Sequence, residues 1–161
     1  MNDYIKVDIT KKSMNEQNIE CIISEYPITQ DYDASVELFR TLKVDDDYPA
    51  FISKFIYAIL DSKESVSNYL VEMFKMLVRD FEEFSDAFGD FICGQMVQLY
   101  AEYEVDYPKC GAIFGNVIRS WITLGKVDRD AFLMRLRSKE ILDEDEKLNM
   151  ELFQENVVVL L

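Results

Sequence analysis

Apolar side chains recur at steps of three and four along the segment 80–103, the longest pattern of this kind in the chain. This spacing places them on one face of an α-helix, whereas a half-buried strand would need strict alternation. The 161-residue chain contains only three prolines and five glycines, so long elements with few turns are expected. Apolar residues make up 49% of the chain, enough for a globular core. The sequence therefore predicts one all-α protein.

Seven or eight helices joined by short connections can be traced in this way. Ser13 precedes Glu16 by three positions, the spacing of a capping box, and marks the start of the first helix. Pro27 is expected to end that helix, and Pro108 to begin a later one that stops at Gly125. The predicted helices lie at about 13–26, 31–43, 49–60, 62–77, 80–103, 108–124, 128–138 and from 143 onward.

These helices are expected to stack as antiparallel pairs in a HEAT-repeat-like arrangement. Three segments follow: an extended arm at 1–12, a helical domain at 13–138, and an additional helix or strand-like tail at 139–161. Gly89 and Gly94 lie inside the longest predicted helix, where a glycine costs about 1 kcal/mol relative to alanine. Close helix packing is the favoured reason for them, and a kink is the alternative.

The formal net charge of −14 restricts the choice of partner. The chain has 31 Asp and Glu residues against 17 Lys and Arg residues. Nucleic acids and anionic membrane surfaces are both bound largely through Lys and Arg, so neither is expected as a direct partner. A basic protein surface is the natural partner, because opposite charge accelerates the encounter.

Histidine is absent, which removes the commonest general base, the Ser-His-Asp and Cys-His arrangements and imidazole metal ligands. The acidic runs 45–47 and 143–146 lack the alternation, central glycine and closing glutamate of a calcium loop. Cys21, Cys93 and Cys110 have no metal-binding spacing and are interpreted as buried thiols. We therefore predict a protein-binding module and not an enzyme, with no metal and no cofactor.

The most unusual local sequence is Glu-Tyr-Glu-Val-Asp-Tyr-Pro at 102–108, where carboxylates alternate with apolar residues between two predicted helices. One interpretation is structural: a helix end, followed by an Asp cap and a proline that opens the next helix. The other is functional: an exposed acidic and apolar loop that binds cationic groups of a partner. Arginine is the natural counterpart, because it can hold a carboxylate with two parallel hydrogen bonds.

At this loop the sequence resembles the MA-3 domain, which occurs in eukaryotic initiation factor 4 gamma and programmed cell death protein 4. The resemblance extends from about residue 18 to 136 and includes DASVELFRTLKV, YPAFISKFIYAILD and EYEVDYPKCGAIFGNVIRSWITLGKV. The last stretch is the most specific. It has an acidic residue, an Asp-x-Pro four positions later, an apolar helix containing Gly115, and a closing Gly-x-apolar at 125–127.

The resemblance implies a stack of antiparallel helix pairs related to HEAT repeats. It also implies binding to a DEAD-box RNA helicase, eukaryotic initiation factor 4A, and regulation of cap-dependent translation initiation. The helicase-binding residues that carry over are Glu102, Asp106 and Pro108, with Glu104 between them as a weaker candidate. Some members of the family inhibit the helicase and others support it, so the direction of regulation stays open.

Two features depart from the family pattern: only one domain copy fits in this chain, and residues 139–161 lie beyond the resemblance. An alternative function therefore remains, that of an acidic helical scaffold that binds a different basic protein or peptide in a groove. The N-terminal sequence lacks the apolar core of a signal peptide, and no run is long enough to span a membrane. We expect a monomer in the cytoplasm, with the nucleus as a second compartment.

Overall fold

The computed structural model describes residues 12–161, so the predicted arm at 1–12 lies outside the described residues except for Lys12. Within this range the chain forms nine α-helices, one π-helical turn and one 3-10 turn, and it has no strand. The predicted all-α class is therefore confirmed. In chain order the elements are α2 (Met14–Thr29), α3 (Tyr32–Phe39), α4 (Tyr48–Asp61), α5 (Glu64–Asp80), α6 (Glu82–Phe91), η1 (Ile92–Met96), α7 (Tyr100–Asp106), α8 (Cys110–Leu124), α9 (Arg129–Arg137), α10 (Glu144–Asn156) and η2 (Val158–Leu160).

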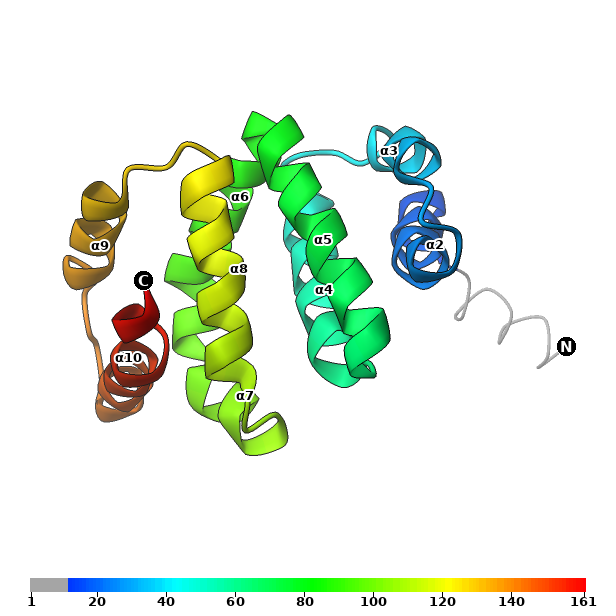
Figure 1. Cartoon of the computed structure of the whole chain (residues 1–161). Helices are drawn as coiled ribbons and strands as arrows, with labels where there is room; N and C mark the ends of the chain where they lie inside the picture. Colours follow the sequence, from blue (N-terminus) through cyan, green and yellow to red (C-terminus); the bar gives the residue numbers. More distant parts are fainter. Residues whose placement is uncertain (1–11) are drawn as a thin grey trace, which may run out of the picture.

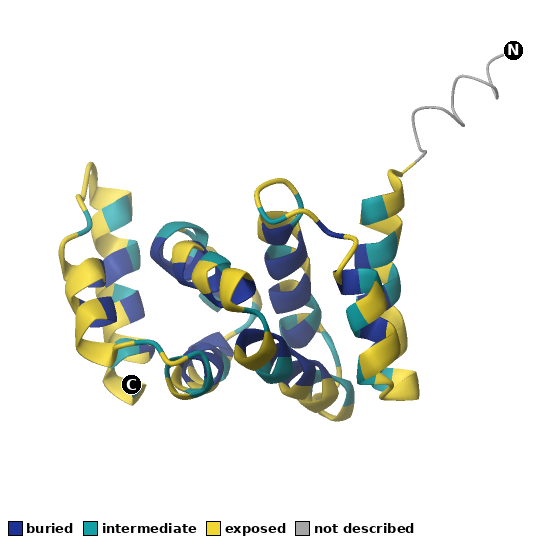
Figure 2. Cartoon of the chain, turned by 90° about the horizontal axis from the view of Figure 1, so that it is seen from above, coloured by how far each residue is buried: buried dark blue, intermediate teal, exposed yellow. Residues whose placement is uncertain are grey.

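The helices form a stack in which α2 and α3 lie at one end and α9 and α10 at the other (Figure 1). Helices α4 and α5 pack as an antiparallel pair joined by a short turn, and α6 and α8 pack beside that pair. Viewed from above, buried residues line the faces where helices meet, and exposed residues cover the outer faces (Figure 2). The architecture is the repeat-like stack of helices that the sequence predicts.

Side-chain caps begin several helices at the predicted places. The Ser13 hydroxyl accepts the backbone N–H of Glu16 at 3.2 Å, which is the first half of the predicted capping box. The carboxylates of Asp31, Asp128 and Asp143 each accept backbone N–H groups in the first turn of α3, α9 and α10. Such caps satisfy donors that have no partner within the helix, and each is typically worth about 1 kcal/mol.

Three predicted boundaries are wrong. Pro27 lies inside α2, which continues to Thr29 and ends at Gln30 in the left-handed conformation (φ 53°). The second helix stops at Phe39, and residues 40–47 form a turn-rich connection. Helix α8 starts at Cys110 and not at Pro108, whose ring restricts the preceding residue and so ends α7 instead. The chain after α10 forms the 3-10 turn η2, so the tail is not strand-like.

The predicted helix 80–103 is divided into α6, η1 and α7, so residues 12–161 contain nine α-helices where seven or eight were predicted. A π-helical turn accommodates one extra residue and shifts the apolar stripe by one position. Tyr100, which is 1% exposed, consequently faces the core, whereas the neighbouring Leu99 is only half-buried. Gly89 shows the predicted close packing, because a Cβ there would lie 3.1 Å from the Trp121 ring. Gly94 belongs to the π-helical turn and has open space around it.

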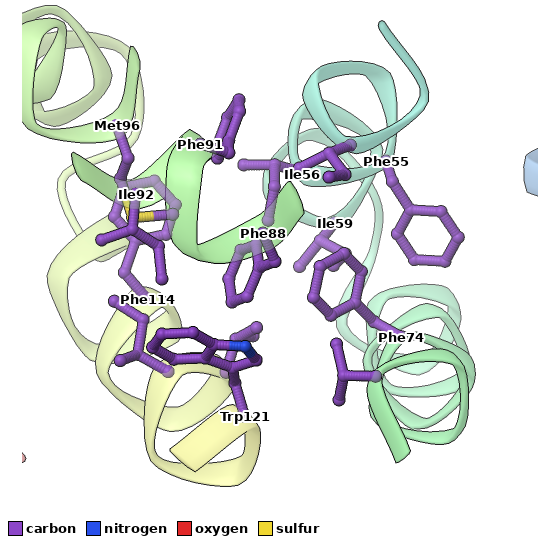
Figure 3. Close-up of a cluster of buried hydrophobic side chains, with 14 of the residues drawn as sticks. Phe55, Ile56, Ile59, Phe74, Phe88, Phe91, Ile92, Met96, Phe114 and Trp121 are labelled. Atoms are coloured by element: carbon purple, nitrogen blue, oxygen red, sulfur yellow. The ribbon is translucent and has the colours of Figure 1, made fainter. Parts of the chain in front are cut away.

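Aromatic rings from four helices pack together in the centre of the stack. Figure 3 shows Phe74 of α5, Phe88 of α6 and Trp121 of α8 pointing toward one another, next to apolar side chains of α4. The Phe74 and Phe88 rings meet edge to face with centroids 4.7 Å apart, and Phe88 meets Trp121 at an interplanar angle of 90°. The indole N–H of Trp121 donates to the hydroxyl and the carbonyl of Ser85, both at 3.0 Å, so this buried donor is satisfied.

The C-terminal segment predicted as an addition at 139–161 packs against the body of the stack. Helix α10 contacts α7 and α8, and η2 contacts α8. Two glycines of α8 allow this approach: a Cβ on Gly111 would lie 3.0 Å from the carbonyl oxygen of Asn156, and one on Gly115 would meet Leu160 at 2.7 Å. The Arg129 guanidinium donates to the backbone carbonyl of Leu161 at 3.0 Å and holds the end of the chain.

Candidate functional site: the acidic turn between α7 and α8

The acidic sequence at 102–108 forms the second half of α7 and the turn that leads into α8. The helix ends because Tyr107 precedes a proline and is held outside the helical region, at φ −134° and ψ 83°. Its backbone N–H still bonds to the Tyr103 carbonyl at 2.7 Å, and its own carbonyl accepts the N–H of Cys110 at 2.9 Å. The first bond closes the end of α7 and the second spans Pro108, so together they fix the geometry of the turn.

Two aromatic residues on the inner face of α7 hold this short helix in the core. Tyr103 meets Phe114 of α8 edge to face, with centroids 5.2 Å apart. Tyr100 meets Phe153 of α10 in the same way at 5.7 Å. Burial raises the pKa of both tyrosine phenols, so they stay neutral as packing groups. The outer face of α7 is thereby presented to solvent on a rigid support.

The structure brings three of the four predicted site residues to this outer surface. Glu102, Asp106 and Pro108 are all exposed. Glu102 and Asp106 are four positions apart on α7, so their carboxylates share one face of the helix. Val105 lies between them in sequence and is 80% exposed, which is unusual for an apolar side chain flanked by acids. Val105 was not among the predicted site residues, although it is one of the apolar residues that alternate with the carboxylates in this sequence.

Glu104 is separated from the other predicted residues. It is half-buried, and its carboxylate accepts a hydrogen bond from the Asn156 amide of α10 at 3.5 Å. It also lies close enough to Tyr100 and Cys110 to raise the pKa of both groups, although burial is the larger cause. Glu104 therefore faces the C-terminal helix and does not share the surface of Glu102 and Asp106.

A groove of about 600 Å³ lies next to the turn, between α8 and the start of α5. Its apolar side chains include Ile59 and Ile113, and Asp106, Tyr107 and Lys109 belong to its rim. The Tyr107 hydroxyl donates to the Asp61 carboxylate at 3.3 Å, which connects the α7–α8 turn to the α4–α5 turn. Figure 1 shows both turns at the same edge of the stack. Partial desolvation and the Asp61 carboxylate raise the pKa of Tyr107.

The carboxylates of the acidic turn are not neutralised within residues 12–161. The ion pairs in this range join Lys12 to Glu20, Lys75 to Glu72, Arg79 to Asp80, Arg129 to Asp130 and Arg135 to Asp90. None of them involves Glu102 or Asp106, so both carboxylates can accept hydrogen bonds from cationic groups outside the chain.

Asp47, the last residue of the acidic run 45–47, has a structural role in the chain. Asp47 accepts the backbone N–H of Lys43 at 2.8 Å and the side-chain amide of Asn15 at 2.7 Å, which ties the connection before α4 to α2. In the described part of the chain, no three side chains of Asp, Glu, Cys or His converge in a way that could hold a metal ion. Of the three thiols, Cys93 and Cys110 are buried as predicted, whereas Cys21 is only half-buried.

Fold and site together define an all-α stack of helices with an exposed, rigidly supported acidic turn at one edge. None of the helices between residues 12 and 161 is long and apolar enough to cross a membrane. Comparison of the chain with protein-family models, with curated proteins and with solved structures finds no match in any of the three. The function therefore has to be argued from the residues and their geometry.

Proposed function

We propose that this chain docks on a DEAD-box RNA helicase, eukaryotic initiation factor 4A, through the α7–α8 turn and regulates cap-dependent translation initiation. The observation that carries the proposal is the exposure of Glu102, Asp106 and Pro108 on one rigid turn, within the sequence that resembles the MA-3 helicase-binding loop. The location that we propose for the chain is the cytoplasm, where it would meet this partner, with the nucleus as a second compartment.

The chemistry of the turn suits recognition of arginine. Two carboxylates one helical turn apart can each receive a guanidinium, and such charge-assisted bonds are about twice as strong as neutral ones. The exposed Val105 adds an apolar contact between them. Because Tyr100 and Tyr103 hold α7 in the core, the turn should lose little conformational entropy when a partner binds.

A binding role also agrees with the residue types available. The sequence contains no histidine, and Glu102 and Asp106 are exposed to water. The net charge of −14 favours a cationic protein surface and speeds its approach.

Isothermal titration of the full chain with the purified helicase at low salt tests the proposal. The variant Glu102→Gln/Asp106→Asn removes both charges and keeps the shapes of the side chains. Each lost charge-assisted bond is worth about 1.5–3 kcal/mol, so affinity should fall at least about tenfold. The matched control is Glu151→Gln/Glu155→Gln, which removes two exposed charges with the same spacing from α10. It should bind like the wild type. Absence of binding by the wild type would refute the helicase as partner.

A further inference from the structure

A second groove, of about 620 Å³, lies between α6 and the segment that leads into the start of α4, and we refer to it as the α4–α6 groove. Its apolar lining includes Val44, Ala87 and Phe91. In Figure 1, α4 and α6 lie behind α5 and α8, so this groove is on a different face from the groove beside the α7–α8 turn. The two grooves have no lining residue in common.

The walls of the α4–α6 groove are acidic. Glu83, Asp86 and Asp90 follow one another along α6 at steps of three and four, so one face of the helix carries three carboxylates. Asp45, from the connection before α4, faces them across the groove. Within residues 12–161, no Lys or Arg forms an ion pair with Asp45, Glu83 or Asp86. Like charges at this spacing repel one another, and a cation bound among them would relieve that repulsion.

One carboxylate of this surface already has a cationic partner within the chain. The Arg135 guanidinium from α9 donates to the Asp90 carboxylate at 2.8 Å. One wall carboxylate is therefore already occupied by a guanidinium, whereas Glu83 and Asp86, further along the same face, have no such partner in the described residues. A cationic side chain from outside would bind these two carboxylates in the same manner.

We infer that the α4–α6 groove binds a cationic, amphipathic segment of a partner protein, with Lys or Arg side chains on Glu83 and Asp86 and aliphatic side chains on the half-buried Val44 and Ala87. An apolar floor between charged walls is the geometry that receives an amphipathic helix. A second copy of this chain, a nucleic acid or an anionic membrane would each bring negative charge to the groove, and the net charge of −14 opposes all three. The inference is independent of the helicase proposal, since it uses another face.

Fluorescence anisotropy with a labelled amphipathic peptide of leucine and lysine, about four helical turns long, tests this inference on the full chain. The variant Glu83→Gln/Asp86→Asn should weaken peptide binding about tenfold. Ala87→Gln, an uncharged change that fills the floor, should weaken it as well. The control Glu151→Gln/Glu155→Gln carries the same loss of two charges on exposed α10 residues and should leave the affinity within about twofold of the wild type.

Thermal unfolding of each variant separates binding from folding. Glu83→Gln/Asp86→Asn should melt close to the wild type, because the relief of repulsion along α6 offsets the lost interaction of Glu83 with the N-terminus of that helix. Equal weakening by the groove and control variants would show that the peptide responds only to total charge, and would overturn the inference. An unmeasurable affinity of the wild type at physiological salt would overturn it too. Helicase titration with the groove variant should match the wild type, so the two proposals fail or stand separately.

Discussion

The Tyr107 hydroxyl donates a hydrogen bond to the Asp61 carboxylate at 3.3 Å, and this contact joins the two turns at one edge of the stack. Tyr107 follows α7, whereas Asp61 is the last residue of α4. The contact therefore couples the acidic turn to a helix pair that is distant in sequence. Together with the buried rings of Tyr100 and Tyr103, it explains why the turn is held in one geometry although its carboxylates are exposed.

The first prediction concerns this contact. Tyr107→Phe keeps the ring but removes the donor, and a solvent-accessible hydrogen bond contributes only modestly, so the protein should unfold at only a slightly lower urea concentration. Amide exchange at Lys109 and Cys110 should become faster, as measured by hydrogen–deuterium exchange. Helicase affinity should fall less than in Glu102→Gln/Asp106→Asn. A loss as large as that of the double variant would show that the phenol, and not the carboxylates, contacts the partner.

A second prediction contrasts two glycines. Gly94→Ala should stabilise the protein by about 0.5–1 kcal/mol, because its Cβ would enter open space and alanine has the lower conformational entropy when unfolded. Gly111→Ala should destabilise it by about 1–3 kcal/mol, because its Cβ would lie 2.8 Å from the Tyr100 hydroxyl and 3.0 Å from a backbone carbonyl. Urea unfolding of both variants measures the difference, and the opposite order would contradict the packing of α10 on α8.

The spacing of apolar residues was sufficient to predict the helices, because each contributes one face to a shared core. Ser13, Asp128 and Asp143 also start their helices as expected, since an N-cap is a local interaction. The division of 80–103 was not predictable in the same way. Phe88, Ile92 and Met96 keep steps of four through the π-helical turn, so the pattern shows no interruption until Tyr100 replaces Leu99 in the core.

The candidate site was predictable only in part. Spacing alone places Glu102 and Asp106 on one face of a helix, and their exposure follows from the aromatic residues opposite them. The half-burial of Glu104 depends on Asn156, fifty-two residues away on α10, and no local pattern contains that contact. The α4–α6 groove escaped sequence reasoning for the same reason, because Asp45 and α6 approach each other only in the folded stack.

A third prediction concerns alkaline pH. Burial raises the pKa of the Cys110 thiol above its value in the unfolded chain, about 8.5. Above that pH the unfolded chain releases the proton while the folded chain keeps it, so unfolding becomes more favourable. The contribution of this thiol to stability is complete below about pH 8.5 and is lost as the pH rises toward the folded-state pKa. Urea unfolding at a series of pH values should show the decline.

Two variants separate the effect of thiol ionisation on stability from the effect of the cavity that removal of the side chain leaves. Cys110→Ala should lower stability at neutral pH but flatten the decline above about pH 8.5. Val117→Ala, a buried truncation on the same helix, should lower stability and keep the slope of the wild type. Equal slopes in the wild type and Cys110→Ala would mean that another group, such as the buried Cys93 thiol, whose pKa is also raised by burial, governs the alkaline decline.

The last prediction tests whether α10 belongs to the domain that supports the acidic turn. Phe153 is 0% exposed and packs edge to face on Tyr100 of α7, so it links the C-terminal helix to the helix that carries Glu102 and Asp106. Phe153→Ala should reduce the free energy of unfolding by about 3–5 kcal/mol in a single cooperative transition. Leu148→Ala, at a half-exposed position of α10, should cost far less. Because Tyr100 loses its partner, Phe153→Ala should also loosen α7 and weaken helicase binding. If α10 of this variant unfolds separately, and the remaining helices and the helicase binding are unchanged, then residues 139–161 are not part of the domain that supports the acidic turn.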